Sequence, residues 1–159
     1  METNANILPI WSRLEELGFS FGGLTARLIV EGDFPLVNEW WITHKKGGFA
    51  VALLPPLGVM VEDESGPVGA LWCYEPAGVG VGFLEFPVTR PGCSAAKAKT
   101  VMAYALATIM GLAGKFYDPP GEYNVFRACT TGPIARFLRR LGFHPDGETV
   151  NLIYTTFSL

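Results

Sequence analysis

Residues 88–102, VTRPGCSAAKAKTVM, join a strand-like run to an Ala-rich helix. Before them, residues 79–89 (VGVGFLEFPVT) predict a long strand, in which Pro87 lacks an amide donor and therefore requires an edge or a bulge. After them, residues 94–114 predict a helix with apolar residues at helical spacing. A strand that leads into the N-terminus of a long helix presents convergent backbone amides and the positive end of the helix dipole, which suits an anionic ligand.

Upstream of this junction, turn and capping residues divide the chain into further elements. Asp33 is expected to act as the N-cap of a helix that has Pro35 in its first turn and ends near His44. Gly66 and Pro67 predict the turn of a hairpin. The upstream elements are a helix at Ile7–Leu17, a strand at Thr25–Val30, the helix that Asp33 begins, and hairpin strands at Gly58–Asp63 and Val68–Tyr74.

Downstream of the long helix, the sequence predicts a strand at Tyr123–Cys129 and a helix that ends at Leu141. Thr130 or Thr131 would cap that helix, with Pro133 in its first turn. Strands are expected from Phe143 onward and at Thr149–Phe157. The order is then β-α-βββ-α-β-α-ββ with an extra N-terminal helix, which predicts an α/β (α+β) fold with a mixed central sheet. We expect one domain over residues 1–159, with residues 1–24 as an N-terminal extension.

The composition excludes several classes of function. The net charge of −3 and the pI of about 5.4 argue against nucleic-acid binding, which usually needs a basic face. The N-terminus lacks the features of a signal peptide, and the apolar stretch at 101–113 is too short for a membrane span, so we expect a cytoplasmic protein with no membrane partner. Widely spaced cysteines and two isolated histidines predict no metal site.

The junction at 88–102 resembles the coenzyme-binding segment of the GNAT superfamily of N-acetyltransferases. In that family a strand ending in Val precedes the loop R/Q-x-x-G-x-G/A and a helix that opens on two apolar residues. Cys93 falls on the R/Q position, Ala96 on the first glycine, and Ala98 on the Gly/Ala. The apolar pair corresponds to Val101 and Met102.

A second segment, residues 131–143 (TGPIARFLRRLGF), resembles the family's N-P-x-A-I-x-x-Y-x-K-x-G-F. Thr131 replaces the asparagine and Leu138 replaces the tyrosine that often protonates the leaving thiolate. The two resemblances cover about residues 25–157. The altered loop is also similar to divergent GNAT proteins that bacteriophages and prophages carry.

The resemblance implies that acetyl-CoA is a co-substrate and that no metal takes part. The pantetheine arm would lie along Val88 and Thr89 as an added strand, with a strand amide beside Val88 polarising the thioester carbonyl. The pyrophosphate would bind the start of the helix. The residues expected there are Gly92, Cys93, Ser94, Ala95, Ala96 and Lys97, and Arg136 is expected to meet the adenosine phosphates. Cys93, at a helix N-terminus, is expected to have a lowered pKa.

The catalytic groups are less well defined than the coenzyme site. Glu85, on the strand expected at residues 79–89, is the candidate general base. Glu62, Asp63 and Glu75 are the alternatives. Because Leu138 cannot donate a proton, Tyr104 is the candidate acid. Water and the tyrosines at 117, 123 and 154 are the alternatives.

We therefore expect an acetyl-CoA-dependent N-acetyltransferase in which an amine, on a small molecule or a protein, attacks the thioester directly. The acceptor pocket is expected around Trp40, Trp41 and His44. Two alternatives stay open: a GNAT-fold binding or structural protein without turnover, and a phage-type relative that modifies DNA bases. A homodimer is kept as an alternative to a monomer.

Overall fold

The structure is a computed structural model that describes residues 8–44, 47–116, 123, 125–130 and 132–144. The chain divides into two compact units, Met1–Cys129 and Thr130–Leu159. The single domain that the sequence predicts stays a prediction.

The first unit is built on a five-stranded mixed sheet in the order β1-β2-β3-β4-β5. The first four strands form an antiparallel meander, because short turns join β2 to β3 and β3 to β4. β5 lies parallel to β4, because the long helix α3 carries the chain back between them. The strands are β1 (Thr25–Leu28), β2 (Leu57–Asp63), β3 (Gly66–Tyr74), β4 (Val81–Thr89) and β5 (Val125–Ala128).

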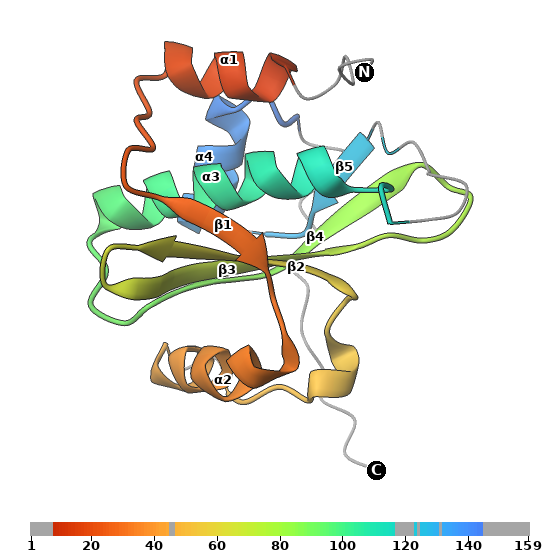
Figure 1. Ribbon diagram of the computed structural model, residues 1–159. Helices are drawn as coiled ribbons and strands as arrows, with labels where there is room; N and C mark the ends of the chain where they lie inside the picture. The colour runs from red at the N-terminus through yellow and green to blue at the C-terminus, as the bar shows by residue number, and fades with distance from the viewer. Residues whose placement is uncertain (1–7, 45–46, 117–122, 124, 131, 145–159) are drawn as a thin grey trace. The chain divides into compact units, whose positions relative to one another are not determined.

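Helices cover both faces of this sheet (Figure 1). Figure 1 shows α3 (Ala95–Leu112) with α1 (Leu8–Glu16) on one face, and α2 (Phe34–Thr43) on the other. Short 3₁₀ turns precede and follow α2, at Glu31–Asp33 and Val51–Leu53. The arrangement is a layered α+β fold with a mixed sheet, as the sequence predicted. No helix in the described ranges is both long enough and apolar enough to cross a membrane.

Two different sets of side chains pack on the two faces. On the α3 face the backbones come close: a Cβ added to Gly69 of β3 would lie 2.4 Å from Cγ1 of Val101. On the α2 face, buried side chains from α2 meet those of β2, β3 and β4, and aromatic rings surround them. The buried cluster of this face comprises Val37, Trp40, Met60, Ala70, Trp72 and Val88. A side chain of β4 therefore packs toward α3 or toward α2, depending on the face of the sheet on which it lies.

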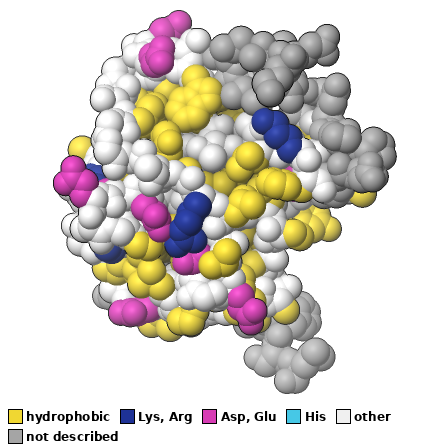
Figure 2. Space-filling model, viewed as in Figure 1, with side chains coloured by type: hydrophobic (Ala, Val, Ile, Leu, Met, Phe, Trp, Pro, Cys, Tyr) yellow, Lys and Arg dark blue, Asp and Glu magenta, His cyan; other side chains and the backbone are white. Residues whose placement is uncertain are grey.

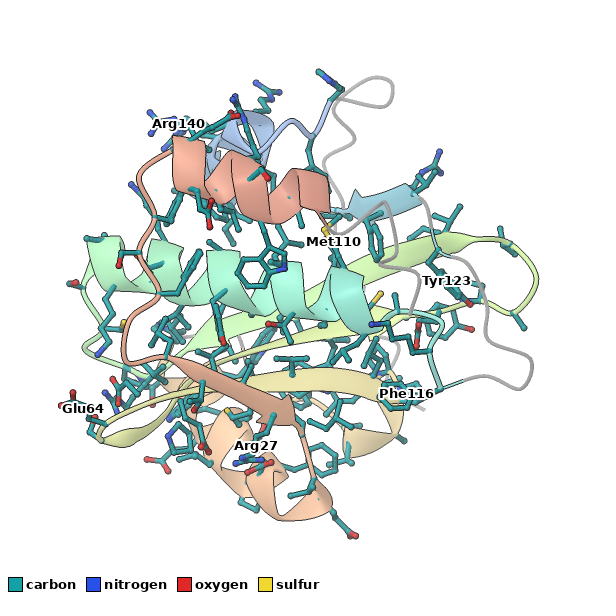
Figure 3. All side chains as sticks on the ribbon, turned by 45° about the horizontal axis from the view of Figure 1, so that its top comes forward. Arg27, Glu64, Met110, Phe116, Tyr123 and Arg140 are labelled. Carbon is teal, nitrogen blue, oxygen red and sulfur yellow. The ribbon has the colours of Figure 1, made fainter. Side chains whose placement is uncertain are left out.

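An ion-pair network fixes the entry into α2. Both oxygens of the Asp33 carboxylate accept hydrogen bonds from Arg27, at 2.7 and 2.8 Å, and the Val30 amide donates to it at 2.9 Å. Figure 3 shows Arg27 between β1 and α2. Asp33 does occupy the N-cap position, but its side chain makes no hydrogen bond to the α2 backbone, contrary to the expected cap. The Arg27 guanidinium lowers the pKa of this carboxyl.

The second unit contains α4 (Gly132–Arg140). The helix ends one residue before the predicted Leu141. The Phe143 amide donates to the Leu138 carbonyl at 3.1 Å, and Gly142 has a φ of 100°, so that Gly142 terminates the helix as expected. Residues 143 and 144 are not in a strand, which corrects the expected start of a strand at Phe143. The predicted strand at Thr149–Phe157 lies outside the described residues. All the other predicted elements are present, with ends shifted by a few residues.

Candidate functional site

A bulge interrupts β4 where the sequence placed Pro87. Ala70 pairs with Val88 and Trp72 pairs with Glu85, so that Phe86 and Pro87 together oppose one residue of β3. Phe86 has a φ of 52°, the only positive φ of a non-glycine residue in the described ranges. This conformation is unfavourable for a bulky side chain. The predicted irregularity at Pro87 is confirmed.

Beyond the bulge, β4 has no strand partner on its β5 side among the residues that the structure describes. The parallel ladder runs from Val81 and Val125 to Leu84 and Ala128, and β4 continues to Thr89. The backbone groups that β4 directs to this side after Leu84 are therefore not paired with β5. An open strand edge of this kind can take up an extended ligand by main-chain hydrogen bonds.

The alternation of the ladder decides which residue faces this open side. The Arg90 amide donates to the Val68 carbonyl at 2.9 Å, which makes Gly69 and Thr89 a non-hydrogen-bonded pair. The N–H and C=O of Val88 consequently point toward β3, and those of Thr89 point away from it. The backbone groups beside Val88 that face the open side are therefore those of Thr89, and the expected contact of Val88 with the coenzyme stays a prediction. In the described residues, the Thr89 amide has no acceptor.

A tight turn connects β4 to α3. The Cys93 amide donates to the Arg90 carbonyl at 3.2 Å, with Pro91 and Gly92 at the centre of the turn and a φ of 81° at Gly92. This is the pattern of a type II turn, in which the third position needs a positive φ. Cys93, expected to offer its amide to a phosphate, thus already uses it within the protein.

The start of α3 retains free donors. Ser94 is the N-cap, and its Oγ accepts a hydrogen bond from the Lys97 amide at 3.2 Å. The next amide, Ala98, donates to the Ser94 carbonyl. The amides without an acceptor elsewhere in the described chain are those of Gly92, Ser94, Ala95 and Ala96. Four such groups at the positive end of an 18-residue helix can hold a phosphate or pyrophosphate.

Lys97 does not extend toward these amides as a free cation. Its ammonium group is paired with the carboxylate of Asp63 at the end of β2, and Arg90 reaches the same carboxylate at 3.2 Å. The hydroxyl and amide of Ser65 also donate to it, at 2.6 and 2.8 Å. Hydrogen bonding from Lys97, followed by that from Ser65, lowers the pKa of Asp63 well below its usual range. Lys97 therefore fastens α3 to the hairpin, and we do not count it among the available phosphate ligands.

Glu85 differs from the three rival carboxylates in having no partner in the described chain. Glu62 accepts from Arg27 at 2.9 Å, Glu75 accepts from the Gly114 amide, and Asp63 binds the cations named above. Glu85 is half-buried opposite Trp72, on the α2 face of β4, and burial alone raises its pKa. A carboxylate with a raised pKa and free lone pairs suits a general base.

Tyr104 does not share a site with Glu85. It lies on α3 on the opposite face of the sheet, where its ring centroid is 5.7 Å from that of Trp11 and 5.3 Å from that of Phe21. The pairing of Tyr104 with Glu85 as acid and base is therefore wrong. The hydroxyl of Tyr123 donates to the Pro76 carbonyl at 3.0 Å, and Figure 3 shows this residue. The tyrosines at 117 and 154 lie outside the described residues.

Tyr74 is a residue that the sequence reasoning missed. Tyr74 lies on β3 and pairs with Phe83 of β4. Because Trp72, two residues before it, pairs with Glu85, Tyr74 lies diagonally across from Glu85 on the α2 face. Tyr74 is 53% exposed. The strand alternation of residues 68–74 contained this signal, since Trp72 and Tyr74 must share a face.

Cys93 also differs from the expectation. Burial raises the pKa of its thiol, and this effect exceeds the opposite influence of Lys97 and Arg90. The expected lowering of the pKa of Cys93 is therefore wrong. On the same side of the sheet as Lys97, a cavity of about 380 Å³ lies between the β2–β3 turn, the loop before β1 and α3. Asp63, Lys97 and Val101 line it, and Glu85 does not.

Arg136 lies in the second unit, on α4, where it is exposed together with Arg139 and Arg140. The spacing of these three arginines places them on one side of the helix. Its expected contact with adenosine phosphates stays a prediction. Leu138 stands on the same helix, so α4 supplies no hydroxyl at the family's tyrosine position.

The sequence matches no protein-family model, and no curated protein is significantly similar to it. Solved structures resemble the fold. A GNAT-family acetyltransferase from Streptococcus pneumoniae has a TM-score of 0.54 at 16% identity over 85% of this chain and 98% of that one. An aminoglycoside acetyltransferase from an uncultured soil metagenomic sample, in complex with sisomicin, has a TM-score of 0.54 at 12% identity over 86% and 98%.

A third similar structure is N-acetylglutamate synthase from Neisseria gonorrhoeae, complexed with coenzyme A and L-arginine. Its TM-score is 0.53 at 13% identity, over 74% of this chain but only 26% of that one, so this chain spans about a quarter of its length. At these identities the likeness establishes the fold alone, and that fold is the GNAT fold. The expected similarity to phage-encoded proteins stays a prediction.

Proposed function

We propose that this chain is an acetyl-CoA-dependent N-acetyltransferase that transfers acetyl to an amine by direct attack. One observation carries the proposal: β4 leaves β5 after Leu84, and beyond that point the amides of Thr89, Ala95 and Ala96 have no acceptor in the described chain. Free donors along a strand edge, followed by free donors at a helix N-terminus, match a ligand that is extended at one end and anionic at the other.

In this arrangement the pyrophosphate and the pantetheine arm of acetyl-CoA each have a counterpart in the first unit. The pyrophosphate accepts hydrogen bonds from Ala95 and Ala96 at the start of α3. The pantetheine arm runs along the open edge, where the Thr89 amide is the donor for its carbonyl oxygens. The acceptor amine approaches from the α2 face, on which Glu85 lies.

The chemical step needs one proton acceptor and one proton donor. The amine nitrogen attacks the acetyl carbon, a C–N bond forms, and the C–S bond of the thioester breaks. Glu85 takes the proton that the amine loses. The thiolate leaves and is protonated by water, since α4 carries Leu138 where the family often has a tyrosine.

The activity or ligand of two of the similar structures supports this proposal. The metagenomic enzyme acts as an acetyltransferase on an aminoglycoside, and the N-acetylglutamate synthase was crystallised with coenzyme A. Leu138 is the observation that favours a second candidate function, a protein that binds acetyl-CoA without turnover.

The test is release of free CoA thiol from acetyl-CoA in the presence of a panel of primary amines. We expect turnover with at least one amine, and a decrease in kcat of about 100- to 10,000-fold in Glu85→Gln. The matched control is Glu64→Gln, an exposed carboxylate in the β2–β3 turn, which should retain full turnover. Binding of acetyl-CoA without turnover on any amine would support the second candidate, and equal kcat in Glu85→Gln would exclude Glu85 as the base.

A further inference from the structure

His44 bridges the end of α2 and the end of β4. Its Nε2 lies 2.8 Å from the carbonyl oxygen of Thr89, 45 residues further along the chain. A carbonyl oxygen only accepts, so Nε2 must carry the hydrogen and donate it. This hydrogen bond therefore holds the His44 ring against the β4 backbone.

The carbonyl that His44 occupies is the one on the open side of β4. The ladder directs the Thr89 peptide groups away from β3, and pairing with β5 ends at Leu84. An extended ligand that adds to this edge uses the N–H and the C=O of the same residue. The Thr89 amide has no acceptor in the described residues, whereas its carbonyl is bonded to His44.

We propose that His44 is a latch on the coenzyme groove, which competes with the pantetheine arm for the Thr89 carbonyl and is displaced when the arm pairs with β4. This inference rests on the function proposed above, because it assumes that the arm of acetyl-CoA lies along Thr89. Both competitors are N–H donors: the imidazole of His44 in the free protein, and an amide of pantetheine in the complex.

The surroundings of His44 allow this exchange. His44 is the C-cap of α2 and is exposed, so that its ring can turn into water without leaving a cavity. Its backbone amide bonds within α2, to the Trp40 carbonyl at 3.0 Å, and that bond does not depend on the ring. Release of the ring therefore leaves the helix intact. The hydrogen bond of His44 therefore weakens the binding of acetyl-CoA by the net free energy of one hydrogen bond.

The experiment is calorimetric titration of the full chain with two ligands, acetyl-CoA and adenosine 3′,5′-bisphosphate, which lacks pantetheine. We expect His44→Ala to bind acetyl-CoA about 2- to 10-fold more tightly than the unsubstituted protein. The affinity for adenosine 3′,5′-bisphosphate should not change. A residue that only stabilised the fold would alter both affinities together, and never in the direction of tighter binding.

The matched control is Thr43→Ala, at the adjacent position, where the hydroxyl bonds to the Glu39 carbonyl inside α2 and not to β4. It should leave both affinities unchanged. His44→Leu, which removes the donor but keeps side-chain bulk, serves if the alanine variant does not fold, and should also tighten acetyl-CoA binding.

Unchanged or weaker binding of acetyl-CoA by His44→Ala, with binding by the unsubstituted protein intact, would overturn the latch and leave the proposed function standing. If neither protein binds acetyl-CoA, the proposed function fails and the latch fails with it. Binding by His44→Ala alone would support the latch in its strongest form.

Discussion

Glu85 shows at the scale of one residue how a fold can preserve a reactive group. Its carboxylate is half-buried beside Trp72 without a cation or a donor in the described residues, whereas Asp63 has Lys97, Arg90 and Ser65 around it. Burial without compensation disfavours the charged form, which explains the opposite pKa directions of the two carboxyls. Such uncompensated groups concentrate at functional sites.

A stability measurement tests this reading of Glu85 without knowledge of the acceptor. A carboxyl whose pKa is raised in the folded state supports folding below its ordinary pKa of 4.5, and this support is lost as the pH rises through the folded value. Glu85→Gln removes the charge, so we expect a higher Tm than the unsubstituted protein at pH 7. The difference should shrink to zero near pH 4, in thermal unfolding followed by circular dichroism.

The control for this measurement is Glu62→Gln, because Glu62 is paired with Arg27 and loses a partner on substitution. It should lower the Tm or leave it unchanged at pH 7. A Glu85→Gln variant less stable than the parent at pH 7 would mean that the carboxylate has a stabilising partner, and would count against its role as a free base.

At the scale of elements, the contact between β3 and α3 depends on the absence of a side chain at Gly69. A Cβ there would lie 2.4 Å from Cγ1 of Val101 and 3.0 Å from Cε of Met102. Gly69→Ala should therefore destabilise the protein by about 1–3 kcal/mol through overpacking. Chemical denaturation with urea measures this free energy of unfolding.

Gly22→Ala provides the comparison for Gly69→Ala, since an added Cβ at Gly22 meets no atom within 4 Å. Its effect should stay within about 0.5 kcal/mol of zero. Equal stabilities of the two variants would show that α3 does not pack on β3 as closely as described, and that the start of α3 is positioned by other contacts.

The sequence predicted the elements of the first unit because its signals are local. Pro87 required an interruption in β4, and Ser94 marked the start of α3, and both are confirmed. The direction of the Val88 and Thr89 peptide groups could not be predicted, because it depends on how the bulge shifts the ladder between β3 and β4. The sequence also could not show that Asp63, at the end of the distant strand β2, would bind Lys97.

At the scale of the whole molecule, faces and charges decide which residues can act together. Tyr104 and Glu85 are only 19 positions apart in sequence, yet α3 places Tyr104 on the side of the sheet opposite Glu85. Sequence patterns do not predict which face a crossover helix will cover with a given residue. On the face shown in Figure 2, Lys and Arg side chains are few and scattered, as the net charge of −3 leads one to expect.

The free amides at the start of α3 are the main donors of the proposed coenzyme site, and Ala95→Pro tests them directly. Ala95 is the first residue of the helix, where proline fits, and the extended conformation of Ser94 (ψ 152°) is the one that proline requires of the preceding residue. The substitution therefore removes one N–H donor without breaking the helix, and Ala95→Ser is the control that keeps the donor.

The decisive measurement is the dissociation constant of acetyl-CoA for the unsubstituted protein, Ala95→Ser and Ala95→Pro, by calorimetric titration. We predict saturable binding to the first two, and binding weaker by roughly tenfold or more in Ala95→Pro at an unchanged Tm. Equal affinities in all three proteins, or no binding to any of them at millimolar acetyl-CoA, would contradict the account.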